Sequence, residues 1–383
     1  MKSHVACLGF AAMIGTALIP CCTRQSLLPS GIISEEKAAS CQTDPRRTGS
    51  STEVLEPPLE KVWSVRLTAA PASRFCANGG VLLAPSQDGR IAFIRIFDGK
   101  TLRTIKVLDR VESSCVVQEG LLITALRWGK HSIIARRLQD GKLIWTADVG
   151  PVESELALGD GFFMVGTGRA EAALIDVRTG KILWRRNLGH PVCGCAAVSP
   201  DSLLFATEGG RLACLSSNGG VVRWSAMLPA GLSADPVIAG GLVLIGTQDG
   251  RFFALDQRSG QEVWHFKAEG GIHLGAASDG LTVFFGTSRG WLYALACGTG
   301  KELWRFRARG AIGTSPILSG ESVYIGSMDK FLYAVDRKTG KGVWETAFKG
   351  RVRSTLLIHG GMLLAGSEEG AVFGFRRDSD VGK

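Results

Sequence analysis

The chain repeats a pattern every 40 residues over most of its length, and this period constrains its fold more than any other feature. Tryptophans mark the period at Trp184, Trp224, Trp264, Trp304 and Trp344. Two further series of positions keep the same step, one from Gly166 to Gly366 and one from Asp176 to Arg376. A repeat of this length is one small unit that cannot bury its apolar face alone, so neighbouring units must stack.

Each unit is expected to be a four-stranded antiparallel blade. Around Trp344, two β runs (Val323–Ser327 and Phe331–Asp336) and a third run that carries the tryptophan are joined by tight turns. The small-residue run Thr314–Leu318 supplies the fourth strand. The 50 glycines of the chain are explained by turns that need positive φ. The sequence therefore predicts an all-β protein.

The period gives eight units. Upstream, the tryptophan position is held by Trp145, by Arg103 and finally by Trp63. The chain thus opens on a tryptophan strand and closes on a unit (Gly361–Phe375) that lacks one. We therefore predict an eight-bladed β-propeller over residues 59–377, closed by the N-terminal strand, with a C-terminal tail over residues 378–383. A closed ring leaves no unpaired end blade.

Two copies, IGTQDGRFFALDQRSGQEVW (Ile245–Trp264) and FGTSRGWLYALACGTGKELW (Phe285–Trp304), carry a family resemblance. They resemble the PQQ-type (quinoprotein-like) propeller repeat, with a consensus of roughly GxVYVGSxDGxLYALDxxTGKxxW. The resemblance covers about Leu59 to Arg377. It implies that the tryptophans dock blade on blade, each fixed against the preceding turn. These are Trp63, Trp145, Trp184, Trp224, Trp264, Trp304 and Trp344.

Residues 1–22 are predicted to be a signal peptide of the lipoprotein type. Lys2 precedes an uncharged apolar run, Val5–Ile19, which is short for a membrane span. Either Cys21 or Cys22 would accept the lipid, although the proline before Cys21 departs from the usual small residue. The alternative is ordinary secretion into the periplasm or medium. The polar, aperiodic residues 23–58 are expected to be a flexible tether.

A single eight-bladed propeller behind such a leader is most similar to the lipoproteins of the β-barrel assembly machinery. That resemblance implies a monomeric, non-catalytic scaffold on the periplasmic face of the outer membrane, in contact with a membrane-embedded or periplasmic protein complex. The formal net charge of +9 would also suit nucleic acid. The export signal and the lack of a basic run with interleaved aromatics favour an acidic partner or anionic lipid instead.

Enzymes share this fold, so function needs its own argument. Quinoprotein dehydrogenases of the same repeat family hold PQQ and a divalent ion on the propeller axis and need long inserted loops. The units here are uniform in length, and the histidines have no metal-ligand spacing (His131, His190, His265, His273 and His359). We therefore expect no catalytic residues, no metal and no cofactor. The alternatives are a PQQ- or quinone-binding oxidoreductase or sensor, and a glycan-binding propeller that uses Trp128 and Trp291.

Two further features concern surface and redox chemistry. Arginines alternate along the outer strands of two successive units, at Arg305, Arg307, Arg309, Arg351 and Arg353. They predict either a partner-binding rim or charges that block edge-to-edge aggregation. The cysteines follow no metal or disulfide spacing and are expected to be small buried residues, with a Cys195–Cys214 bond left open.

Overall fold

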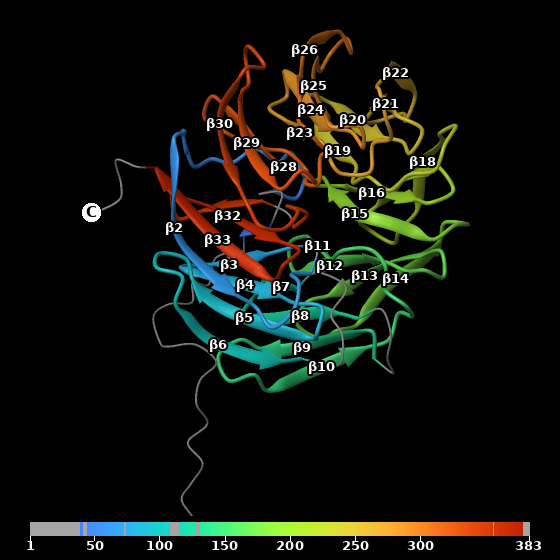
Figure 1. Cartoon of the computed structure of the whole chain (residues 1–383). Helices are drawn as coiled ribbons and strands as arrows, with labels where there is room; N and C mark the ends of the chain where they lie inside the picture. The colour runs from blue at the N-terminus through green and yellow to red at the C-terminus, as the bar shows by residue number, and fades with distance from the viewer. Residues whose placement is uncertain are drawn as a thin grey trace, which may run out of the picture.

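Eight antiparallel sheets stand around a central axis and confirm the eight-bladed propeller (Figure 1). The structure is a computed structural model and describes residues 39–40, 44–72, 74–107, 115–126, 131–354 and 356–377. None of these residues forms a helix of the length and hydrophobicity that a membrane crossing requires. The signal peptide, both candidate lipidation cysteines and the C-terminal tail lie outside the described residues.

The strands of each blade follow one another from the axis outward, except in the last blade. Blades 1 to 4 contain β3 (Cys76–Asn78), β4 (Val81–Pro85), β5 (Arg90–Arg95), β6 (Thr101–Lys106); β7 (Cys115–Gln118), β8 (Leu121–Ala125), β9 (Ile133–Arg137), β10 (Leu143–Ala147); β11 (Ala157–Leu158), β12 (Phe162–Gly166), β13 (Glu171–Asp176), β14 (Ile182–Asn187); and β15 (Val192–Val198), β16 (Ser202–Thr207), β17 (Arg211–Ser216), β18 (Val222–Met227). Blades 5 to 8 contain β19 (Val237–Ala239), β20 (Leu242–Gly246), β21 (Arg251–Asp256), β22 (Glu262–Lys267); β23 (Ala277–Ser278), β24 (Thr282–Gly286), β25 (Trp291–Ala296), β26 (Glu302–Arg307); β27 (Ile317–Ser319), β28 (Ser322–Gly326), β29 (Phe331–Asp336), β30 (Gly342–Ala347); and β31 (Leu357–His359), β32 (Met362–Ser367), β33 (Ala371–Arg377), β2 (Leu59–Arg66).

The N-terminal strand closes the ring. The sequence predicts this closure, because the chain opens on a tryptophan strand and closes on a unit that lacks one. β2 pairs antiparallel with β33, from Leu59 opposite Arg377 to Arg66 opposite Ala371, and becomes the outermost strand of blade 8. On its other side, the Trp63 Nε1–H donates to the carbonyl of Ile96 in blade 1 at 2.8 Å. One strand therefore joins the last blade to the first.

Five of the other docking tryptophans repeat this contact around the ring. The Trp264 Nε1–H donates to the carbonyl of Cys297 in the next blade at 2.9 Å. Its indole lies over Gly300 (φ +69°), where a Cβ would come within 2.6 Å of the ring. The same bond joins Trp145 to Val177, Trp184 to Ser217, Trp224 to Gln257 and Trp304 to Arg337. Each indole thus lies on a turn of the following blade, and the expected contact with the preceding turn is wrong.

The turns beneath Trp145, Trp224 and Trp304 are each held by an aspartate at the end of the third strand, whereas Ser216 and Ala296 occupy that position for Trp184 and Trp264. The carboxylate of Asp256 accepts hydrogen bonds from the backbone N–H and the hydroxyl of Ser259, both at 2.8 Å. These bonds hold the pKa of Asp256 below its usual range. They also position Gly260 (φ +71°) under Trp224. Asp176 and Asp336 bind Thr179 and Thr339 in the same way.

Two junctions depart from this pattern. Trp344 packs edge-on against Phe375 of blade 8, with ring centroids 6.0 Å apart. Arg103 occupies the tryptophan position of blade 1, and there Leu102 and Ile105 of β6 pack on the apolar cluster shared by blades 1 and 2. Aliphatic packing therefore replaces the indole at that junction.

The range predicted for the tether, residues 23–58, extends too far toward the C-terminus. Residues 44–58 cross the inner ends of blades 4 to 8, and the blue trace in Figure 1 passes near β28 before it reaches β2. Arg47 and Leu55 are buried, at 4% and 3% exposure. Farther upstream, β1 (Ala39–Ser40) pairs with β3 of blade 1. The composition of this segment is that of a tether, but its backbone is hydrogen-bonded to distant units.

We predict that Trp264→Ala lowers the free energy of unfolding by about 3–5 kcal/mol, because it removes a buried aromatic side chain and its hydrogen bond. Trp264→Phe keeps an apolar ring and loses the bond to Cys297, so it should cost less than the alanine variant. Val263→Ala, at an exposed neighbour, is the matched control and should stay within about 0.5 kcal/mol of the parent. Urea denaturation measures all three. A loss under about 1 kcal/mol in Trp264→Ala would contradict the docking role.

Candidate functional site

Two carboxylates and two guanidinium groups meet on the axis of the ring. Asp235, 3% exposed and just before β19 of blade 5, lies 3.0 Å from Arg47 Nη2 and also pairs with Arg74. Arg74, just before β3 of blade 1, pairs in addition with Glu155 of blade 3. The Cys195 N–H donates to the second Asp235 oxygen at 2.6 Å. Because blades 1 and 5 lie on opposite sides of the ring, this network crosses the channel.

A pocket of about 320 Å³ remains at the mouth of the channel. Its polar residues come from segments that precede the innermost strands, and Ser233 Oγ lies 3.1 Å from His273 Nδ1 across blades 5 and 6. The lining residues are Arg74, Glu153, Ser154, Glu155, Gly194, Ser233, Asp235, His273, Leu274 and Gly275. The pocket therefore opens onto the ion-pair network.

These axial residues do not fit PQQ and a divalent ion. Asp235 and Glu155, which would have to supply metal ligands, are each paired with a guanidinium group, and Arg74 fills the space between opposite blades. In the part of the chain that the structure describes, no three His, Cys, Asp or Glu side chains come together as a metal-binding group. The acidic side chains on the axis are instead neutralised by arginines of the same chain.

The sequence prediction missed this network, although the repeat contains a signal for it. Aligning the units at the 40-residue step places Glu155, Cys195, Asp235, Gly275 and Ser315 at one equivalent position. Three of these residues are small and two are acidic. A buried carboxylate needs a partner, so the two acidic exceptions indicate that basic residues must reach the axis from elsewhere.

The arginine row is largely neutralised within the ring. Arg305 pairs with Glu269 of the preceding blade at 2.8 Å, and Arg309 binds both carboxylate oxygens of Glu345 at 2.8 and 3.1 Å. Arg351 and Arg353 share Glu368. Such exposed pairs add little to stability, because water and salt screen them. Four of the five arginines thus have a carboxylate partner before any other protein is present.

Arg307 differs from the rest of the row. No carboxylate of the described residues lies within ion-pair distance of its guanidinium group. Its guanidinium carbon lies 4.6 Å from the ring centroid of Trp291, and that of Arg305 lies at the same distance. Trp291 is therefore already contacted by two cations, which disfavours its use as a free platform for a sugar. Trp128, the other candidate for glycan binding, lies outside the described residues.

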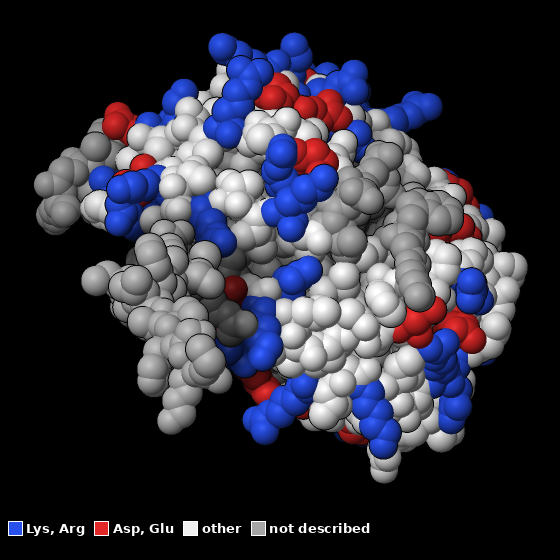
Figure 2. Space-filling model, turned by 90° about the horizontal axis from the view of Figure 1, so that it is seen from below, with Lys and Arg blue, Asp and Glu red and all other residues white. Residues whose placement is uncertain are grey.

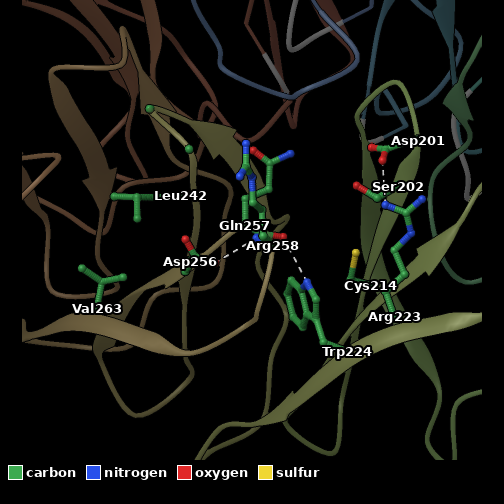
Figure 3. A pocket seen from close by; sticks show the side chains of 12 residues that line it. Asp201, Ser202, Cys214, Arg223, Trp224, Leu242, Asp256, Gln257, Arg258 and Val263 are labelled. Carbon is green, nitrogen blue, oxygen red and sulfur yellow. Dashed lines mark hydrogen bonds and ion pairs between the residues drawn. The ribbon is translucent and has the colours of Figure 1, made fainter.

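A larger pocket of about 970 Å³ lies between blades 4 and 5 (Figure 3). On one side, Arg223 pairs with Asp201 at 2.7 Å and lowers the pKa of that carboxyl. On the other side, Asp256 is engaged in the turn that supports Trp224. The pocket is a crevice beside a docking tryptophan, and its carboxylates already have partners.

The described cysteines are all free thiols, so the open Cys195–Cys214 bond does not form. β15 and β17, which carry these two residues, are separated by β16. Burial, followed by the nearby charges of Asp235 and Glu208, raises the pKa of the Cys193 thiol to about 12. Cys193 is therefore protonated at neutral pH and a poor nucleophile.

Charge on the outer surface is mixed in sign. Figure 2 shows Lys and Arg side chains interspersed with Asp and Glu on the side of the ring viewed from below. Several basic groups lie directly beside acidic ones, and uncharged surface separates them. The net charge of +9 is thus not collected into one continuous basic stripe on this side.

Comparison with known proteins places the chain in a family. A family model described as outer membrane protein assembly factor BamB matches residues 55–191, 168–290 and 288–380. The BamB protein of Yersinia pestis is 24% identical over 181 residues, which cover 43% of this chain and 45% of that protein. The match thus spans less than half the length of this curated relative.

Solved structures support the fold. BamB from Moraxella catarrhalis superposes with a TM-score of 0.70 at 18% identity, over 83% of this chain and 99% of that one. A quinohemoprotein alcohol dehydrogenase from Comamonas testosteroni gives a TM-score of 0.74 at 12% identity, over 90% and 81% of the two chains. At these identities the likeness shows the propeller fold alone. Because the family model covers nearly the whole propeller, the chain belongs to the family described as outer membrane protein assembly factor BamB.

Proposed function

We propose that this chain is a non-catalytic, exported scaffold that supports the assembly of β-barrel outer-membrane proteins through protein–protein contacts. The observation that carries the proposal is the pairing of the acidic side chains on the axis of the ring with arginines. Where a dehydrogenase of this fold would need open ligands for a cofactor, Asp235 and Glu155 are paired with Arg47 and Arg74. Family membership supports the same reading. The ring would act as a monomer and need no bound cofactor.

The arginine row is the proposed contact surface: Arg305 and Arg307 lie on β26, the outermost strand of blade 6, whereas Arg309, Arg351 and Arg353 lie in the segments that follow β26 and β30 and not on the outer strands expected for them. Arg307 is its centre, because it is exposed, has no carboxylate partner among the described residues and is stacked on Trp291. A partly immobilised arginine beside an aromatic ring loses little side-chain entropy on binding, and this pair of residue types often dominates interfaces. The outermost strand also offers its backbone edge to a partner strand.

Affinity purification from detergent-solubilised outer membranes should recover β-barrel assembly proteins together with this chain. Arg307→Glu should reduce that recovery at least fivefold and weaken its dependence on salt, because a charge contact is reversed. Arg258→Glu is the matched control: Arg258 is also exposed and has no side-chain ion pair within 4.0 Å among the described residues, but lies at the opposite end of the blades. Both variants should melt like the parent.

Three results would count against this proposal. Equal recovery with both arginine variants would move the contact away from the row. Failure of the parent to recover any barrel-assembly protein would reject the scaffold role. Stoichiometric PQQ in the purified protein, or quinone-dependent dye reduction, would favour the oxidoreductase instead.

We also propose that the protein is anchored to the outer membrane through a lipid on Cys21 or Cys22. Two or three acyl chains hold a protein firmly, since each buried methylene contributes about 0.8 kcal/mol. Replacing both cysteines by serine should release the propeller into the soluble exported fraction, while either single replacement identifies the acceptor. Mass spectrometry of the mature N-terminus is the control. An unmodified N-terminus at Leu18 would instead support plain secretion.

A further inference from the structure

The N-terminal segment Asp44–Glu56 is bound like a peptide ligand along the inner rim of the propeller. The carbonyls of Pro45, Arg46, Thr48 and Gly49 accept hydrogen bonds from the backbone N–H groups of Val198, Ile238, Ser278 and Leu318, at 2.7–3.0 Å. These donors occupy the same position in four successive blades, 40 residues apart. Four residue steps, from Pro45 to Gly49, thus contact four blades. The repeat itself creates a row of equivalent donors.

Arg47 supplies the side-chain anchor of this segment. It points into the channel, where its guanidinium group lies 3.0 Å from Asp235 and its side chain is 5% exposed. Arg47 and Arg74 both bind Oδ2 of Asp235, so without Arg47 this buried carboxylate would have one guanidinium partner, which it shares with Glu155. An arginine in the bound segment is therefore strongly selected, because a buried charge without sufficient partners is costly.

Gly49 adds a steric requirement two residues later. Its φ is +63°, and a Cβ there would lie 2.9 Å from the Cβ of Ala277 and 3.1 Å from the carbonyl oxygen of Pro316. Both neighbours belong to the innermost parts of blades 6 and 7 and cannot retreat without disturbing the core. Only glycine fits at this point.

The C-terminal part of the segment is held by blades 7 and 8. The carboxylate of Glu53 accepts hydrogen bonds from the N–H groups of Gly360 and Gly361 at 3.0 and 2.6 Å. The Tyr324 hydroxyl donates to the carbonyl of Leu55 at 2.6 Å, and the Leu55 side chain is buried in the core. The recognised pattern is therefore Arg-x-Gly followed by an acidic and an aliphatic residue.

We infer that the inner rim of blades 4 to 8 is a binding site for a peptide with this Arg-x-Gly pattern, and that residues 44–56 fill it in cis. The site lies on the innermost strands, whereas Arg307 lies on the outermost strand of blade 6, so the inference does not depend on the partner proposed above. Covalent linkage gives the cis segment an effective concentration in the millimolar range. A peptide in trans therefore competes only when the cis segment is weakened.

The first test uses the full-length chain with Arg47→Gln. Exchange of the four amide hydrogens of Val198, Ile238, Ser278 and Leu318, followed by NMR, should accelerate at least tenfold. Amides in the middle strands β16 and β20 report global unfolding and should keep their protection. Unchanged protection of the four rim amides would overturn the role of Arg47.

The second test supplies the segment in trans. The full-length Arg47→Gln/Gly49→Val double variant is mixed with a synthetic peptide of the parental sequence Asp44–Glu56. The parental peptide should raise the melting temperature and restore protection at the four rim amides. Peptides carrying Arg47→Gln or Gly49→Val should bind at least tenfold more weakly.

Two outcomes of this test would reject the site. The first is no binding of the parental peptide while the middle-strand amides show an intact ring. The second is equal binding of all three peptides. If the double variant does not fold, the single Arg47→Gln chain with excess peptide gives the same comparison.

Discussion

The packing of an indole on a glycine of the next blade is the contact on which the rest of the ring depends. The indole needs a flat, Cβ-free surface and a carbonyl that accepts from Nε1. Gly300 and Cys297 provide both for Trp264. In several other units the equivalent turn is fixed by an aspartate at the preceding strand end, such as Asp256 beneath Trp224. A 40-residue repeat can therefore propagate around a circle, because each unit carries the indole for the next unit and the glycine for the previous one.

The N-terminal segment closes the ring through contacts at two places, the outer edge of the propeller and its inner rim. On the outside, β2 completes blade 8 and places Trp63 on blade 1. On the inside, residues 44–56 cross blades 4 to 8 and bring Arg47 to the axis. The N-terminal segment thus supplies both the outermost strand of blade 8 and an arginine of the ion-pair network in the channel. This arrangement separates the chain from a propeller whose axis is kept open for a cofactor, although the two share a backbone fold.

The periodic part of the structure could be predicted from the sequence almost to the residue. The glycines of the 40-residue series at 246, 286 and 326 are the last residues of β20, β24 and β28, whereas β16 and β32 each run one residue past the equivalent position. Periodicity succeeds here because every unit meets the same neighbours. Periodicity also predicted the ring closure. The last unit lacks a tryptophan strand and an additional one stands at the N-terminus, so the N-terminal strand completes the last blade.

The aperiodic part could not be predicted in this way. Residues 44–58 have the composition of a tether, and their order comes from hydrogen bonds to units more than 150 residues away. The arginine row could be identified in the sequence, but the carboxylates that pair with it could not. Arg305 meets Glu269 and Arg309 meets Glu345, both 36 residues apart. That offset differs from the repeat period because the partners face each other across a blade junction.

Native-state hydrogen exchange with increasing denaturant would test the central claim, that the N-terminal residues are an integral part of a closed ring. The amides of β2 should exchange through the same opening reaction as those of β33, with a free energy close to that of blades 5 and 6. Exchange of β2 at a much lower free energy, with little dependence on denaturant, would contradict the account. It would mean that the strand only rests on an already complete propeller.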